Sequence, residues 1–135
     1  MILLGPGAWV ALVDRGNPDH DECVRALKEL TEPLASIWPV VGEAMNALRE
    51  VPKGQDVVWE MIERGAVQLL TLDDEDVGPI RELMRRHADK RMSLADAGLL
   101  HVAERESIRT IFTVRGKEFS TYRLSGSGRR LKVIP

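Results

Sequence analysis

The sequence predicts an α/β fold in which helices cover both faces of a mainly parallel sheet of four or five strands. Two observations support this prediction. Short apolar runs alternate with longer stretches of helical periodicity, which is typical of strands joined by crossover helices. The chain has 135 residues, 44% of them hydrophobic and 30% charged, a balance typical of a globular protein. We therefore expect one domain with one core, spanning residues 1–135.

The chain is expected to open with a strand and two helices. Apolar residues 2–4 predict a buried strand, and the Gly5-Pro6-Gly7 turn leads into a brief helix at residues 8–13. Residues 17–19, an Asn-Pro-Asp sequence, provide a cap and a first turn for a second helix that continues to residue 30.

A second strand and two further helices should follow. Residues 34–37 form an apolar run, and Pro39 suits the first turn of the next helix, which carries Glu43 one turn in. Residues 54–64 place apolar side chains on one side of another helix. Gly65 is expected to end that helix as its C-cap.

A third strand is expected at residues 67–70, before a run of four carboxylates at residues 73–76. Acidic side chains are stabilised at helix N-termini, so we interpret this run as the start of a helix that continues to residue 87. Ser93 then predicts the N-cap of a long helix through residue 106, and Asp96 lies in its first turn.

Two strands complete the predicted sheet. Residues 111–113 form the fourth, and residues 132–134 form an edge strand after the Ser125-Gly126-Ser127-Gly128 turn. Strands separated by helices favour right-handed crossovers and a three-layer arrangement. In such sheets binding sites form beyond the carboxyl ends of the strands.

Composition excludes several classes of protein. Cys23 is the single cysteine, so no intrachain disulfide can form and no cysteine cluster can bind zinc. The apolar start is interrupted at Gly5, and neither a signal peptide nor a membrane span is expected. A reducing, cytoplasmic location is the simplest interpretation. The net charge of −2 gives no overall attraction to nucleic acid, so RNA binding would depend on local patches.

Three carboxylates are candidates for one site at the edge of the sheet: Glu43, Asp96 and Glu118. Oxygen ligands from two or three carboxylates can hold Mg²⁺, and the ion could activate water for attack on a phosphate. The alternative stays open, because Asp96 also suits a helix N-terminus and Glu118 could be simply solvated.

Other residue types were weighed beside these acids. The three histidines have no metal-ligand spacing, and Trp9, Trp38 and Trp59 are expected in core or dimer packing. Basic residues, among them Arg91, flank the proposed groove. These side chains either bind the phosphates of an RNA chain or are solvated at the ends of helices.

Several motifs in order give the chain a resemblance to PIN-domain proteins, and specifically to VapC-type toxins of toxin-antitoxin modules. The motifs are Ala8-Trp9-Val10-Ala11-Leu12, Asp14-Arg15, His20, Trp38-Pro39-Val40-Val41-Gly42-Glu43-Ala44, Met92-Ser93-Leu94-Ala95-Asp96-Ala97, Ile111-Phe112-Thr113, Phe119 and Tyr122-Arg123.

This resemblance implies a Mg²⁺- or Mn²⁺-dependent endoribonuclease that forms homodimers and is neutralised by an antitoxin protein. Glu43 and Asp96 match two acids of the family's cluster, and Glu118 falls where a further acid often lies. Because basic residues cluster beside the proposed groove, Arg115, Lys117 and Arg91 are candidates for binding the RNA substrate.

The chain departs from the family pattern at two positions. Gly5 stands where the family has Asp, before Thr or Ser, and Arg115 stands where a further Asp is usual. We therefore expect weak metal binding and weakened hydrolysis. We also expect Arg115 to pair with Glu43 or Asp96. The alternative is a catalytically inactive PIN-like module that binds RNA, an antitoxin-like peptide or itself.

Overall fold

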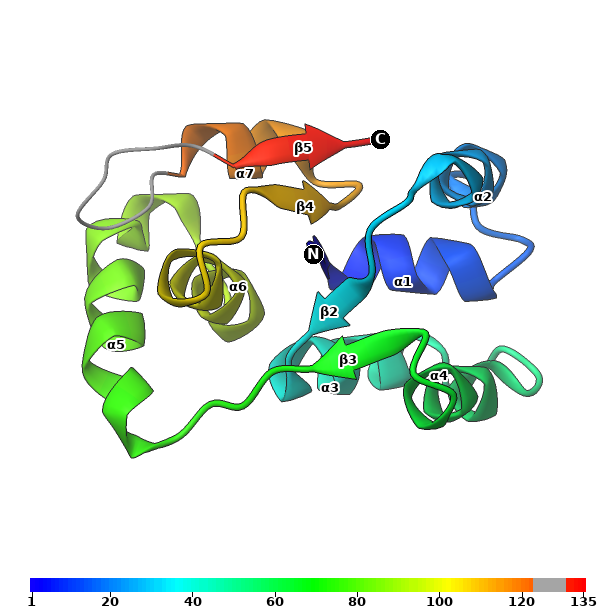
Figure 1. Ribbon diagram of the computed structural model, residues 1–135, viewed down its shortest axis with the longest axis horizontal. Helices are drawn as coiled ribbons and strands as arrows, with labels where there is room; N and C mark the ends of the chain where they lie inside the picture. Colours follow the sequence, from blue (N-terminus) through cyan, green and yellow to red (C-terminus); the bar gives the residue numbers. More distant parts are fainter. Residues whose placement is uncertain (123–130) are drawn as a thin grey trace.

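The computed structural model describes residues 1–122 and 131–135 and contains a five-stranded parallel sheet with the order β3-β2-β1-β4-β5 (Figure 1). All four neighbouring strand pairs are parallel. The predicted class, an α/β fold with helices flanking a parallel sheet, is confirmed. The strands are β1 (Ile2–Leu4), β2 (Leu34–Ser36), β3 (Val67–Leu69), β4 (Thr110–Phe112) and β5 (Lys132–Ile134).

Helices connect every strand to the next along the chain, as the alternation of apolar runs and helical stretches predicts. The elements between β1 and β3 are α1 (Pro6–Val13), α2 (His20–Glu29), α3 (Trp38–Ala47) and α4 (Gly54–Glu63). The elements after β3 are η1 (Asp74–Asp76), α5 (Val77–Arg86), η2 (Ala88–Lys90), α6 (Leu94–Arg105) and α7 (Gly116–Thr121).

The strand order reverses its direction beside β1, and this reversal positions the candidate site. The chain runs from β1 through β2 to β3 on one side and returns to β4 on the other. Leu4 of β1 is in register with Phe112 of β4, and the N–H of Gly5 donates to the Phe112 carbonyl at 2.9 Å. The carboxyl ends of β1 and β4 therefore meet where ligands bind in sheets of this kind.

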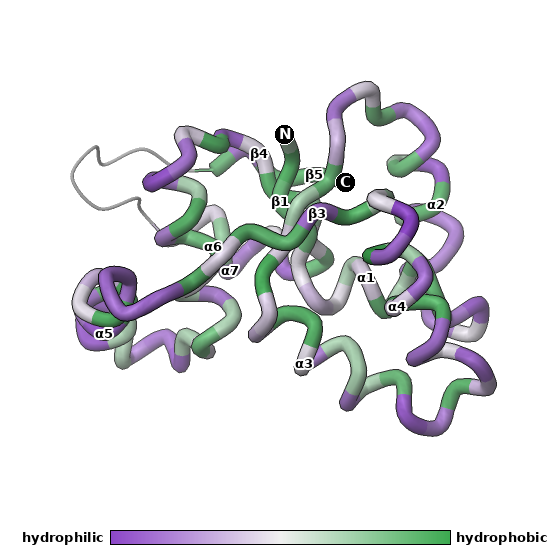
Figure 2. The backbone as a smooth tube through the Cα atoms, turned by 60° about the horizontal axis from the view of Figure 1, so that its bottom comes forward, coloured by the Kyte–Doolittle hydropathy of each residue, from purple (hydrophilic) through white to green (hydrophobic). Residues whose placement is uncertain are grey.

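Helix α6 lies in the interior and is buried almost all round. Its buried residues run without interruption from Ala95 to Leu100 and continue at Val102 and Ala103. A Cβ on Gly98 would lie 2.5 Å from Ile37 Cδ1, so any larger residue there would require the Ile37 side chain to move. Leu94, at the start of the helix, is exposed. Figure 2 shows hydrophobic central strands and a largely hydrophilic α5.

The helix termini follow the local signals in the sequence. Asp73 and Asp76 form a reciprocal capping box around η1, which confirms that the acidic run is a helix start. Gly65 has a φ of +78° and follows α4, as expected of a C-cap. The 3₁₀ turn η1 before α5 and the short helix α7 were not predicted. The Ser125-Gly128 turn and Arg123 lie outside the described residues.

The tryptophans divide into two groups. Trp9 is fully buried in the core, as predicted. Trp38 and Trp59 are exposed and pack against each other, with ring centroids 6.1 Å apart, so the prediction of core packing is wrong for this pair. Within the part of the chain that the structure describes, no helix is long and apolar enough to cross a membrane.

Candidate functional site

Asp96 lies buried near the carboxyl edge of the sheet, in the first turn of α6. Ser93 caps the helix by accepting a hydrogen bond from the Asp96 N–H at 3.1 Å. Because the cap uses the serine side chain, the Asp96 carboxylate is free to point elsewhere. Its side chain is only 1% exposed, and a buried carboxylate needs a partner.

Arg115, which follows β4, is that partner. Its Nη1 donates to both carboxylate oxygens of Asp96, at 3.0 Å to Oδ1 and 2.9 Å to Oδ2. The Arg115 N–H donates to Thr113 Oγ1 at 3.0 Å and so fixes the backbone after the strand. The expected pairing of Arg115 with Glu43 or Asp96 is therefore confirmed for Asp96.

Tyr122 completes the surroundings of Asp96 from the end of α7. Its hydroxyl donates to Asp96 Oδ2 at 3.4 Å, and its ring packs edge-on against Phe119 and His87. Burial and then the charge of Asp96 raise the pKa of Tyr122 above its ordinary value. Burial acts to lower the pKa of the Arg115 guanidinium. The neighbouring negative charges, that of Asp96 first, have the larger opposite effect, so this pKa is raised. Arg115 and Asp96 are thus an ion pair with an N···O distance of 2.9 Å.

The other two predicted carboxylates are not buried with Asp96, although Glu118 is close enough for its charge to contribute to the raised pKa values of Arg115 and Tyr122. Glu43 on α3 and Glu118 on α7 are both exposed. Among the described residues, no three His, Cys, Asp or Glu side chains are arranged to hold a metal ion. With Gly5 providing no ligand and Arg115 on Asp96, the residues present do not fit a divalent ion. The roles of Glu43, Asp96 and Glu118 in catalysis stay a prediction.

The predicted substrate-binding residues lie on segments that meet. Lys117 is exposed in the first turn of α7, and Arg91 is exposed directly after η2. The neighbouring Lys90 Nζ donates to the Thr121 carbonyl at 3.3 Å, which joins η2 to the end of α7. Basic side chains from two parts of the sequence thus flank the same region of the molecule.

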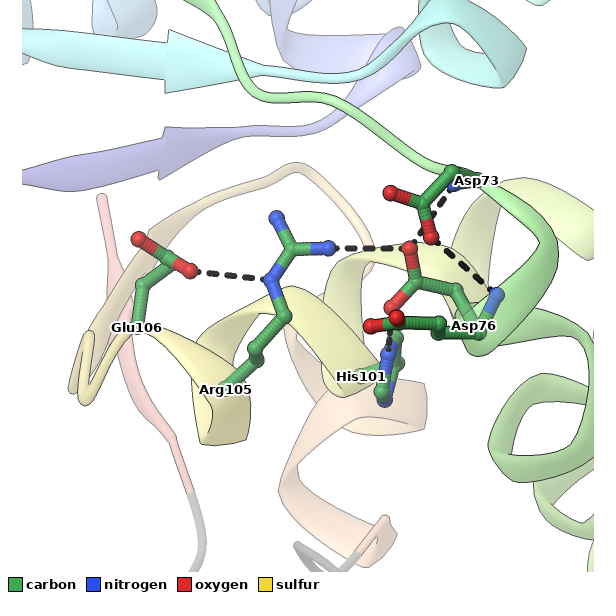
Figure 3. Close-up of polar contacts among 6 residues, drawn as sticks. Asp73, Asp76, His101, Arg105 and Glu106 are labelled. Atoms are coloured by element: carbon green, nitrogen blue, oxygen red, sulfur yellow. Dashed lines mark hydrogen bonds and ion pairs between the residues drawn. The ribbon is translucent and has the colours of Figure 1, made fainter.

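A second buried aspartate was missed as a site residue. Asp76 accepts hydrogen bonds from the Asp73 N–H at 2.9 Å, from His101 Nε2 at 2.6 Å and from Arg105 Nη1 at 3.1 Å (Figure 3). His101 and Arg105 are four residues apart on α6 and so share a helix face. That spacing is a signal in the sequence, but it does not identify the acid that they bind.

The Asp76 cluster has the properties of a structural contact. Hydrogen bonds from the Asp73 backbone and from His101, with a further contribution from Arg105, lower the pKa of Asp76 to about 2 against the opposing effect of burial. Arg105 Nε also donates to Glu106 at 2.9 Å, outside the buried part of the cluster. The carboxylate is fully used in joining η1 to α6.

Comparisons with known proteins place the chain in a family. A family model described as PIN domain matches residues 6–123. Ribonuclease VapC26 of Mycobacterium tuberculosis (strain ATCC 25618 / H37Rv) is 26% identical over 137 residues, which cover 99% of this chain and 100% of the relative.

Two solved structures share the fold. Mycobacterium tuberculosis VapC20, described as a sarcin-ricin loop cleaving toxin, has a TM-score of 0.80 at 18% identity, covering 87% of this chain and 92% of its own. A toxin-antitoxin complex from Klebsiella pneumoniae has a TM-score of 0.69 at 16% identity, covering 100% and 97%.

Proposed function

Because this chain belongs to the PIN domain family, we propose that it is the toxin of a VapC-like toxin-antitoxin module and an endoribonuclease that cleaves RNA phosphodiesters. The observation that carries the proposal is the buried Asp96 near the carboxyl edge of the sheet, in a chain that matches a ribonuclease over 99% of its length. Similarity over nearly all of both chains also supports the same class of activity. A cytoplasmic location belongs to the same proposal.

The acids that we assign to the site are Glu43, Asp96 and Glu118, with Mg²⁺ or Mn²⁺ as the ion that the family implies. When bound, such an ion would supply an activated water and stabilise charge on the phosphate. In this chain the ion would be held weakly at best, because Asp96 is already paired and the other two acids are exposed. We therefore propose that hydrolysis is impaired.

Cleavage of a mixed RNA substrate with Mn²⁺ present tests this activity. Glu43→Gln and Asp96→Asn should each reduce the residual cleavage rate, whereas Glu50→Gln, an exposed acid one turn beyond α3, should not. Activity that is the same in all four proteins would come from another site or from a contaminant.

The RNA backbone would be bound by Arg115, Lys117 and Arg91. Each phosphate contact releases counterions, so affinity should fall steeply with salt. We expect Lys117→Ala and Arg91→Ala each to lower the slope of log affinity against log salt by about 1, measured by fluorescence anisotropy. Arg25→Ala, on α2, is the control and should leave the slope unchanged. Unchanged slopes in all three variants would remove these residues from the interface.

The alternative function is a catalytically inactive module that binds RNA, an antitoxin-like peptide or itself. The Asp96-Arg115 pair and the missing side chain at Gly5 favour it. RNA binding with no cleavage by the wild type under any divalent ion would establish the alternative over the enzyme.

An antitoxin protein is the second partner that we propose, supported by the toxin-antitoxin complex among the structural neighbours. Coexpression with the product of an adjacent reading frame should give a complex that copurifies and no longer binds RNA. A chain that toxifies cells equally with and without that product would contradict this assignment.

We also propose that the protein forms a homodimer. A groove of about 850 Å³ beside α5 supports this assembly. Exposed Val77 and Leu94 line the groove. Asp73 and Asp74 lie at one end of α5, whereas Arg81 and Arg85 line its later turns. A two-fold axis across the groove would bring the acidic end of one copy to the basic residues of the other.

Charge exchange tests this dimer by sedimentation velocity. Arg81→Glu/Arg85→Glu and Asp74→Lys should each be monomeric alone, because like charges then meet across the axis, and should form a heterodimer when mixed. Glu82→Arg, on α5 but outside the groove lining, should stay dimeric. A monomeric wild type would contradict the assembly.

A further inference from the structure

Arg115 contacts the Asp96 carboxylate in the way that a bound metal cation would, with one atom close to both oxygens. A single guanidinium nitrogen faces both oxygens, at 3.0 and 2.9 Å. The Asp96 side chain is 1% exposed, so it has almost no surface left for a second partner. A divalent ion would have to displace the guanidinium or lie beside its fixed positive charge.

The position of Arg115 is set by the fold and not by the flexibility of a surface side chain. Its N–H is bonded to Thr113 Oγ1 at the end of β4, and the next residue, Gly116, begins α7. A Cβ on Gly116 would lie 3.1 Å from Val133 Cγ1 of β5, which shows how closely this segment packs on the edge strand. The guanidinium is therefore directed at Asp96 from a fixed backbone.

The end of β1, which lies beside Phe112 and Thr113 at the end of β4, lacks a carboxylate although the backbone would accept one. Gly5 has a φ of −83°, which any residue can adopt. A Cβ there would meet Thr113 Oγ1 at 3.4 Å and the Phe112 carbonyl at 3.5 Å, which are ordinary contacts. Glycine at this position therefore removes a ligand and is not required by the backbone.

From these observations we propose that Arg115 is a resident cation that takes the place of a divalent ion at Asp96. In the RNA-free protein the site then excludes Mg²⁺ and Mn²⁺ up to millimolar concentration, and the protein folds without either. The inference concerns the same site as the proposed function, but it rests on the ion pair. It can therefore fail or hold whatever the outcome with RNA.

Titration of Mn²⁺ into the RNA-free protein, followed by calorimetry, tests the proposal. The wild type should show no saturable binding at millimolar Mn²⁺. Arg115→Asp removes the cation and adds an oxygen ligand, so it should bind at least about tenfold more tightly, and Gly5→Asp/Arg115→Asp more tightly again.

Two control variants separate the ion pair from net charge. Lys117→Asp makes the same change in charge as Arg115→Asp, two residues away on an exposed side chain, and should bind no Mn²⁺. Arg115→Lys keeps a cation at the site and should also exclude Mn²⁺. Binding by Lys117→Asp equal to that of Arg115→Asp would overturn the proposal, since general electrostatic attraction would then suffice.

A thermal measurement keeps the proposal testable if Arg115→Asp does not fold. Arg115→Gln leaves Asp96 without its charged partner, and Mn²⁺ should then raise the melting temperature of this variant but not that of the wild type. Saturable Mn²⁺ binding by the wild type, or an equal rise in melting temperature for both proteins, would overturn the proposal. A wild type that excludes Mn²⁺ yet cleaves RNA would instead contradict the metal dependence of the proposed enzyme.

Discussion

Two buried aspartates in this protein each bind an arginine, but they use their carboxylates differently. Asp76 receives donors from the Asp73 backbone, His101 and Arg105, which come from separate segments. Asp96 receives one guanidinium nitrogen on both oxygens and a long contact from Tyr122. The first carboxylate joins parts of the fold, whereas the second has one charged partner at the place where relatives of this fold bind ligands.

The difference shows how a buried acid can be assigned a role. When several backbone and side-chain donors converge on one carboxylate, removing it leaves many groups unsatisfied, and the acid is structural. When one partly exposed cation neutralises the acid, removing the acid leaves only that cation without a partner, and the cation can regain water. The Arg115 side chain is 35% exposed, which places Asp96 in the second group.

The largest effect that we predict is the loss of Asp76. Asp76→Asn should lower the free energy of unfolding by about 3 kcal/mol, because His101 and Arg105 would be left without their buried anion. Urea denaturation measures this change. Asp89→Asn, at an exposed aspartate of η2, is the matched control and should stay within about 0.5 kcal/mol of the wild type. Equal stability of the two variants would remove the structural role of Asp76.

A smaller loss is expected at the candidate site. Asp96→Asn should cost about 2 kcal/mol in the same assay, because it loses charge-assisted hydrogen bonds but Arg115 can regain water. If the variant were less stable than Asp76→Asn, Asp96 would be the more structural of the two acids, and the comparison above would be reversed.

Acid should selectively remove the contribution of Asp76. Its pKa is about 2 in the folded protein, below the ordinary value of 3.8, so its stabilisation is complete above pH 3.8 and is lost as pH falls through that value toward 2. The difference in unfolding free energy between the wild type and Asp76→Asn should therefore shrink across this window. A difference that stays constant with pH would mean that the carboxylate charge is unimportant.

The smallest predicted effect is spectroscopic. Tyr122 is the only tyrosine, so phenolate absorbance reports its ionisation directly. The midpoint should lie above 10.0 in the wild type and should fall in Asp96→Asn, because burial remains but the neighbouring negative charge is gone. Identical midpoints would show that the tyrosine does not sense Asp96.

Most of the secondary structure could be predicted because its signals are local. Ser93 caps α6 and Gly65 ends α4 through contacts within a few residues. Helix α7 was missed because six residues give too little periodicity to recognise. The site was only partly predicted, since an arginine partner for Glu43 or Asp96 was expected, but the burial of Asp96, the exposure of Glu43 and the cluster around Asp76 were not.

The sequence by itself determined the parallel α/β fold, the caps, the family resemblance and the replacement of an acid by Arg115, because these depend on residue type and short spacing. The tertiary structure alone decided which acids are buried and how they are neutralised. Asp96 meets Arg115 across 19 residues, and Asp76 meets His101 across 25. Contacts over such separations depend on how closely α6 packs on the rest of the fold, which Gly98 permits but local sequence patterns do not reveal.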